Sequence, residues 1–191
     1  MKKRYKVDVL DYMVTSNHVH LLVAAREGGE ISEGLRFIHG RIGQWHNGQR
    51  SGEGAFWAGR FHSTRIQSGE HLGRCLFYID LNMVRAGVVG HPCEWRHCSY
   101  SEFMGMRKRC RVVNLKKLLK CLGAGSVEIF REWYVKTLGE KLKARKTERD
   151  NFWSSAVAVG DSDWLGEKAG EYGLKRFRIV DADSVHYIVG K

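Results

Sequence analysis

The sequence has 191 residues, of which 43% are hydrophobic, and this length is sufficient for a domain with its own core. Lys and Arg exceed Asp and Glu by 11 charges, with the largest local excess at residues 111–150, so a polyanion is the favoured partner. No run of 18 apolar residues and no signal peptide is found, which excludes a membrane-spanning protein and makes a cytoplasmic location the expected one. The five cysteines are odd in number and scattered, which indicates reduced thiols in that compartment.

The first predicted element is a hairpin of two strands. Residues 6–14 and 18–25 are apolar and rich in β-branched side chains, and the turn-forming residues 15–17 separate them. In the second strand, His18 and His20 are two residues apart and would point to the same face. Two parallel imidazoles form half of a metal site, although such a pair on a strand edge can equally be a surface feature.

A helix is predicted next, over residues 31–45, with Ser32 as a possible cap. Its apolar side chains recur at helical spacing: Leu35, Ile38, Ile42 and Trp45. The glycine-rich residues 47–59 are predicted to form a loop, in which Trp57 either stacks on unpaired bases or packs into the core. A third strand is expected over residues 60–66.

A second helix is predicted from Ser68 or Glu70 to Gly87, a natural stop. Its apolar stripe consists of four side chains at helical spacing: Leu72, Leu76, Ile79 and Met83. Tyr78 and Asn82 are neighbours one turn apart, roughly 100° around the helix from that stripe. A phenol and a carboxamide are thus presented together, although each alone is more simply explained as a structural side chain.

The irregular residues 91–98 contain two histidines and two cysteines, which raises the possibility of a zinc site. Their spacing fits no standard structural zinc site, and one short segment rarely supplies four tetrahedral ligands by itself, so a zinc site is the less favoured interpretation. A basic cluster over residues 107–111 follows, and helices are predicted for residues 115–122 and 127–145. A small hairpin of residues 175–180 and 186–189 is expected at the end of the chain.

The motifs, in this order, resemble the HUH single-tyrosine transposases, and within them the REP-associated tyrosine transposases. The resemblance rests on Asn17-His18-Val19-His20-Leu21-Leu22, on Trp57-Ala58-Gly59-Arg60-Phe61 and on the run from Tyr78 through Asn82 to Gly87, and it spans roughly residues 6–105. It implies an α+β fold with a ferredoxin-like antiparallel sheet that has helices on one face, and a turn over residues 91–98 that closes the catalytic domain. Relatives carry a strand and a helix before the equivalent of Lys6, so we expect a truncated sheet with unpaired backbone at one edge, unless residues 175–189 fill the gap.

Two domains are therefore expected: a transposase-like catalytic domain over residues 1–105, and a basic, mostly helical extension over residues 106–191 that ends in the hairpin. The resemblance implies metal-dependent cleavage and rejoining of single-stranded DNA beside a hairpin, with Tyr78 as the nucleophile that forms a 5′-phosphotyrosine. His18, His20 and Asn82 would hold the metal, and hard phosphate oxygens in its shell favour Mg²⁺ or Mn²⁺. A monomer and a homodimer are equally compatible with the sequence.

The predicted DNA contacts are positively charged or aromatic side chains near these motifs and on the extension: Arg36, Arg41, Trp57, Arg60, Arg85, Arg107, Lys108, Arg109, Lys141, Lys143, Arg145 and Lys146. For each charge, a merely solvated side chain is the plainer interpretation. Two other functions remain open. One is a catalytically inactive remnant that still binds hairpin DNA, and the other is a metal-dependent RNA-processing nuclease that uses water.

Overall fold

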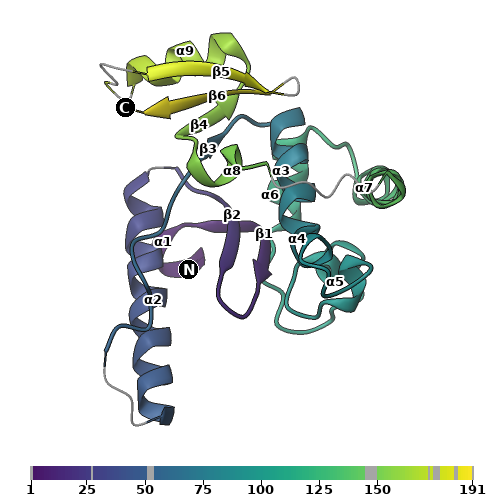
Figure 1. The fold of residues 1–191 in the computed structure, drawn as a ribbon. Coiled ribbons are helices and arrows are strands. Elements are labelled where there is room, and N and C mark those ends of the chain that lie inside the picture. Colours follow the sequence, from purple (N-terminus) through teal and green to yellow (C-terminus); the bar gives the residue numbers. More distant parts are fainter. Residues whose placement is uncertain are drawn as a thin grey trace.

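The chain combines helices and strands in an α+β fold (Figure 1). The structure is a computed structural model, and it describes residues 2–26, 28–50, 54–144, 150–171, 173, 177–182 and 185–190. In chain order its elements are α1 (Lys2–Tyr5), β1 (Asp8–Val14), β2 (Val19–Ala24), α2 (Gly28–Arg50), β3 (Arg65–Ile66), α3 (Glu70–Asp80), α4 (Asn82–Arg85), η1 (Pro92–Glu94), α5 (Tyr100–Phe103), α6 (Leu115–Leu122), α7 (Val127–Lys143), α8 (Phe152–Ser155), β4 (Ala158–Gly160), α9 (Ser162–Glu171), β5 (Phe177–Ala182) and β6 (Val185–Gly190). None of the helices in those ranges has both the length and the apolar character that crossing a membrane requires.

The predicted first hairpin is confirmed. β1 and β2 pair antiparallel, with Met13 opposite His20. Thr15 closes the turn, because its N–H donates to the His18 carbonyl oxygen over 2.9 Å and its Oγ1 accepts from the His18 N–H over 2.9 Å. These turn bonds hold His18 outside the ladder, so β2 begins at Val19 and not one residue earlier.

Helix α3 packs against this hairpin through the predicted stripe. All four stripe side chains are less than a tenth exposed: Leu72, Leu76, Ile79 and Met83. They share one cluster of buried side chains with Leu10 and Met13 of β1. The helix begins at Glu70, as predicted, and α4 continues it by a turn. Gly87 follows with φ of 69°, a left-handed conformation that suits glycine and ends the helical stretch.

Two later segments cover the outer edge of β1, where the sequence analysis expected unpaired backbone. The Val14 N–H donates to the His97 carbonyl oxygen over 2.9 Å, and the Asn114 N–H donates to the Val9 carbonyl oxygen over 2.7 Å. Single β-bridges accompany these bonds at Cys98 and Val113. Backbone groups at this edge are therefore satisfied without a further strand.

A second sheet has four strands in the order β3-β4-β6-β5. β5 and β6 form the predicted terminal hairpin, which is confirmed, and β6 also pairs antiparallel with β4. The predicted third strand over residues 60–66 was wrong in length. Only Arg65 and Ile66 are in a strand, and they pair parallel with β4, while the Thr64 hydroxyl just before them donates to the Ala156 carbonyl oxygen over 2.8 Å.

The ferredoxin-like sheet is not confirmed. In the described part of the chain, β1 and β2 form a sheet of their own, and the last strands join the second sheet. The hypothesis that residues 175–189 complete the first sheet was therefore wrong. The physical reason is that segments around Cys98 and Val113 already occupy the edge of β1.

Helix α2 is longer than predicted and starts before Ser32, which therefore lies inside the helix and does not cap it. Figure 1 shows its C-terminal half projecting away from the hairpin. Leu35 near its start is buried, but Ile42 is 36% exposed and Trp45 is 66% exposed. The predicted apolar stripe is thus covered only at the end where α2 meets α1 and the body of the protein.

The helices of the extension follow the sequence more closely. α6 covers the predicted residues, with Asn114 as its N-cap and Gly123 in a left-handed conformation at its end. α7 starts as predicted, and its predicted end at residue 145 lies outside the described residues. Its core side chains are Phe130, Tyr134 and Leu138, whereas Trp133 is 39% exposed. These core residues share the buried cluster of α3, so packing continues across the predicted boundary at residue 105.

Two carboxylic acids lie inside this shared core. Asp11 of β1 and Asp80 of α3 are fully buried, and one oxygen of each has no hydrogen-bond partner in the described structure. The other oxygens accept hydrogen bonds, from the Ser99 hydroxyl for Asp11 and from the Tyr134 hydroxyl over 2.6 Å for Asp80. Loss of solvation raises the pKa of Asp11 to about 7. It also raises the pKa of Asp80, to which repulsion by Asp11 adds.

We expect Asp11→Asn to stabilise the protein at neutral pH. The folded protein keeps a proton on Asp11 up to about pH 7, whereas the unfolded chain releases it near the ordinary pKa of 3.8. Wild-type stability should therefore fall as pH rises between those values. The variant should lose the part of this dependence that comes from Asp11, keep the part from Asp80, and gain about 2 to 4 kcal/mol at pH above 7. Urea unfolding at several pH values measures this, with Asp150→Asn, an exposed site, as the matched control. A variant whose stability follows pH as steeply as the wild type would contradict it.

Candidate active site

The histidine pair, the tyrosine and the asparagine converge at one end of the hairpin. The rings of His18 and His20 are nearly parallel, with 6.4 Å between centroids and 12° between planes. The His20 ring also meets the Tyr78 ring edge-on at 6.3 Å. The amide nitrogen of Asn82 lies 3.1 Å from His20 Nε2, although the two residues are 62 positions apart in the sequence.

The local folding of each segment explains this meeting. Met13 and His20 are cross-strand partners, so their side chains share the face of the hairpin that α3 covers. Met13 is fully buried under α3, and His20 is half-buried at the rim of the same contact. The break after Asp80 leaves Asn82 at the start of α4, half-buried and beside His20.

Tyr78 is more buried than the sequence predicted, at 8% exposed. It does lie off the apolar stripe, but α8 from the extension covers that flank. The Trp153 ring lies 5.8 Å from the Tyr78 ring, and the Ser154 Oγ lies 3.3 Å from its hydroxyl, where either group can donate. Ser154 itself is exposed, so the hydroxyl of Tyr78 lies just below the surface. The sequence analysis missed both α8 residues, because neither has a spacing that relates it to Tyr78.

Arg85 is held against the tyrosine. Its guanidinium carbon lies 4.5 Å from the centre of the Tyr78 ring, and Nη2 donates to the Tyr78 carbonyl oxygen over 2.5 Å. A cation over the ring favours negative charge that develops on the phenol oxygen. Arg85 therefore contacts the candidate nucleophile itself.

The donor set fits a divalent cation that binds two imidazoles and an amide oxygen. The 3.1 Å between His20 Nε2 and the Asn82 amide agrees with the roughly 3 Å that separates adjacent ligands when bonds are about 2.1 Å long. Amide oxygen and nitrogen are assigned from the hydrogen-bond network, so the side chain of Asn82 can present its oxygen after a flip. Across the described ranges, no three His, Cys, Asp or Glu side chains form a metal-binding group. A metal here would thus depend on Asn82 and on ligands from substrate or water.

The segment of residues 91–98 forms a turn, as expected. His91 Nδ1 accepts from the Cys93 N–H over 3.1 Å. The Cys98 thiol is fully buried and donates to the Trp95 carbonyl oxygen over 2.9 Å. Loss of solvation raises the pKa of Cys98 to about 12, which disfavours the thiolate that zinc requires.

Comparison with protein families supplies an independent observation. Residues 1–82 match the family model described as "Transposase IS200 like", and the matched range contains the histidine pair, Tyr78 and Asn82. The match covers 82 of the 191 residues, less than half of the chain, and shows that this segment is similar to the IS200-like transposases. Searches of curated proteins and of solved structures gave no significant match. The similarity of this segment points to transposase-type processing with DNA as the partner.

The predicted DNA contacts are distributed over several segments of the protein. Six are exposed charges: Arg36, Arg41, Arg60, Lys108, Arg109 and Lys143. Trp57 is half-buried, stacked on the His39 ring at 4.2 Å, with its Nε1–H donating to the His39 carbonyl oxygen. Lys141 lies over the Phe77 ring at 5.6 Å. Arg145 and Lys146 lie outside the described residues, and Arg107 belongs to a polar network on the other face of the hairpin.

We expect Trp153→Leu to uncover Tyr78 while the core stays folded. The shorter side chain removes the ring that covers the tyrosine, at a cost of about 2 kcal/mol in the free energy of unfolding. Nitration by tetranitromethane followed by peptide mass mapping should then modify Tyr78 faster than in the wild type. Tyr134, fully buried in α7, is the internal control and should remain unmodified in both proteins. Equal nitration of Tyr78 in both proteins would show that α8 does not shield it.

Proposed function

We propose that this protein is a transposase that cuts and rejoins single-stranded DNA through a covalent bond to Tyr78. The observation that carries the proposal is the convergence of Tyr78, His20 and Asn82, with 3.1 Å between His20 Nε2 and the Asn82 amide nitrogen. The family match over these residues supports it. Single-stranded DNA beside a hairpin, as in the REP-associated branch that the motifs resemble, is the proposed substrate.

In the proposed step, Tyr78 Oη attacks a backbone phosphorus and forms an O–P bond. The P–O bond to the 3′-oxygen of the preceding nucleotide breaks, and that oxygen gains a proton to match the one that the phenol loses. The product is a 5′-phosphotyrosine and a free 3′-hydroxyl. Because the ester conserves the bond energy, reversal of the step rejoins DNA without a nucleotide cofactor. Arg85, 4.5 Å from the ring, is suited to stabilise the phenolate during attack.

His18, His20 and Asn82 would hold Mg²⁺ or Mn²⁺. When bound, the ion would supply positive charge to the phosphate oxygens. The exposed His18 and the half-buried His20 leave this side of the group open to a phosphate. For a DNA phosphate to reach the Tyr78 hydroxyl, α8 must move, because Ser154 of α8 lies against that hydroxyl.

Tyr78→Phe tests the chemistry directly. A pool of single-stranded DNA labelled at the 3′ end, incubated with the full chain and Mn²⁺, should give a protein–DNA band on a denaturing gel. The 3′ label is necessary because the fragment with the new 5′ end is the one that remains attached. Tyr78→Phe should reduce the band at least about 100-fold, since the nucleophile is gone. Tyr5→Phe is the matched control, because it retains the ring that packs on Phe37 and should give the wild-type yield.

A second function is favoured by the burial of Tyr78, which is 8% exposed. A catalytically inactive DNA-binding protein would bind the labelled pool and give no band in either protein. Cleavage that persists in Tyr78→Phe would instead point to a metal-dependent nuclease that uses water. Either outcome would overturn the covalent mechanism.

A further inference from the structure

A pocket of about 410 Å³ lies on the other face of the hairpin. Its walls come from β1 and from the segments that cover the edge of β1: Tyr12, Val14, Arg96, His97, Arg107 and Val112. Tyr12 pairs with Leu21, one position out of phase with the Met13–His20 pair. Because successive side chains of a strand point to opposite faces, the pocket and Tyr78 lie on opposite faces of the hairpin.

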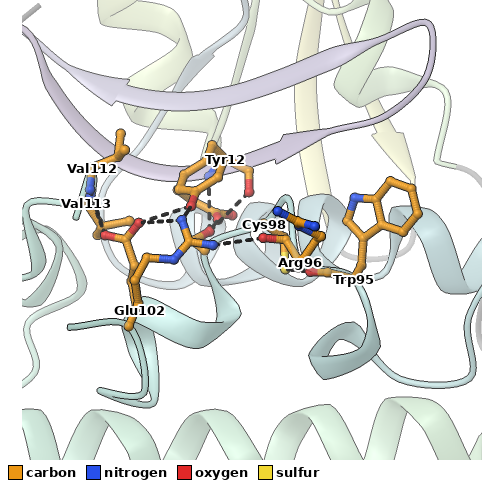
Figure 2. A network of polar contacts seen from close by, with 10 residues as sticks. Tyr12, Trp95, Arg96, Cys98, Glu102, Val112 and Val113 are labelled. Carbon is orange, nitrogen blue, oxygen red and sulfur yellow. Dashed lines mark hydrogen bonds and ion pairs between the residues drawn. The ribbon is translucent and has the colours of Figure 1, made fainter. Parts of the chain in front are cut away.

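Arg107 is fixed at the wall of this pocket. Its Nη1 donates to the Tyr12 hydroxyl over 2.5 Å, and its Nη2 donates to the Arg96 carbonyl oxygen over 2.8 Å. Figure 2 shows this network, with Tyr12 and Glu102 on one side and Arg96 on the other. These bonds orient the guanidinium before any ligand arrives, and the Arg107 side chain is still 27% exposed.

Glu102 forms a long ion pair with Arg107, which offsets part of the Arg107 charge and leaves that of Arg96. Its nearest oxygen is 3.5 Å from Arg107 Nη1. The carboxylate is occupied elsewhere, since Oε2 accepts from the N–H groups of Val112 and Val113 at 2.8 Å and Oε1 accepts from the Tyr12 hydroxyl at 3.0 Å. Its side chain is only 2% exposed, so Glu102 holds the pocket wall together and faces little solvent.

The pocket is positively charged on balance. Arg96 is exposed and has no acidic partner among the residues that the structure describes. His97 beside it is exposed as well, and the exposed Lys108 and Arg109 follow Arg107 in the sequence. Two guanidinium groups at an open pocket, one of them pre-oriented, match the chemistry of a phosphate group.

We propose that this pocket binds a phosphodiester group of the DNA strand that the enzyme processes. The inference rests on the proposed function for the identity of the polyanion. It adds a second contact, on the face opposite Tyr78, so that a bound strand passes around the covered edge of β1 near Arg96 and reaches both faces of the hairpin.

Arg96→Gln is the informative variant, because the backbone carbonyl that anchors Arg107 remains. Fluorescence anisotropy with a labelled single-stranded oligonucleotide should show about 5- to 10-fold weaker binding. The plot of log affinity against log salt should be shallower by about 0.7. Lys136→Gln, an exposed charge on α7, is the matched control and should change affinity by less than about 2-fold.

Replacing single phosphates of the oligonucleotide by neutral methylphosphonates identifies the contacted group. We expect one linkage whose replacement weakens binding of the oligonucleotide to the wild type. The same replacement should leave the affinity of Arg96→Gln unchanged. If Arg96→Gln and Lys136→Gln bind equally well, or if no linkage shows this coupling, the pocket is not a DNA site. If inorganic phosphate, at matched ionic strength, occupies the pocket while DNA affinity is unaffected by Arg96→Gln, the site serves a free anion and the inference is also overturned.

The two proposals fail separately. A wild type that forms the Tyr78 adduct while Arg96→Gln retains full affinity refutes only the pocket inference. A wild type that binds DNA through the coupled linkage and forms no adduct refutes only the covalent mechanism. The anisotropy measurement requires binding alone, so it reports on the pocket in either case.

Discussion

The packing of α3 on one face of the β1–β2 hairpin is the constraint on which the candidate site depends. Met13 and Leu76 are fully buried in that contact. Because the pairing register places His20 next to Met13, burying Met13 fixes His20 at the rim of the helix. Asn82 then lies 3.1 Å from the imidazole. The functional geometry is thus a consequence of hydrophobic packing, which is why groups far apart in the sequence meet without a direct link.

Two buried carboxylic acids in the interface between the hairpin and α3 reduce the stability of the protein. Asp11 and Asp80 lie between the hairpin, α3 and α7 with one unpartnered oxygen each. Burial of such groups favours their neutral forms, so part of the stabilisation from the core is offset near neutral pH. On the opposite face of the hairpin, the oxygens of the buried carboxylate do have hydrogen-bond partners. There the buried Glu102 accepts hydrogen bonds from two backbone N–H groups and from Tyr12, and it also pairs with Arg107, whose side chain stays partly exposed at the pocket.

The structural elements that depend on periodicity and on local sequence signals could be predicted from the sequence. The hairpin, the stripe of α3, the bounds of α6 and the terminal hairpin follow from short-range patterns, and the structure has them. Long-range pairing was not predictable. Residues 60–66 carry a strand pattern, but their partner is β4, more than 90 positions later. The cover of Tyr78 by Trp153 and the closing of the edge of β1 around Val113 also arise only from tertiary packing.

Anomalous diffraction from crystals that contain Mn²⁺ tests the central claim most directly, namely that the early histidines and the later helix build one cation site. The account predicts a single strong peak bounded by His18, His20 and Asn82. The peak should be lost in Asn82→Leu, while His46→Ala, which alters a histidine on α2, should leave it in place. A peak elsewhere in the wild type, or no peak at a Mn²⁺ concentration that supports DNA cleavage, would contradict the account.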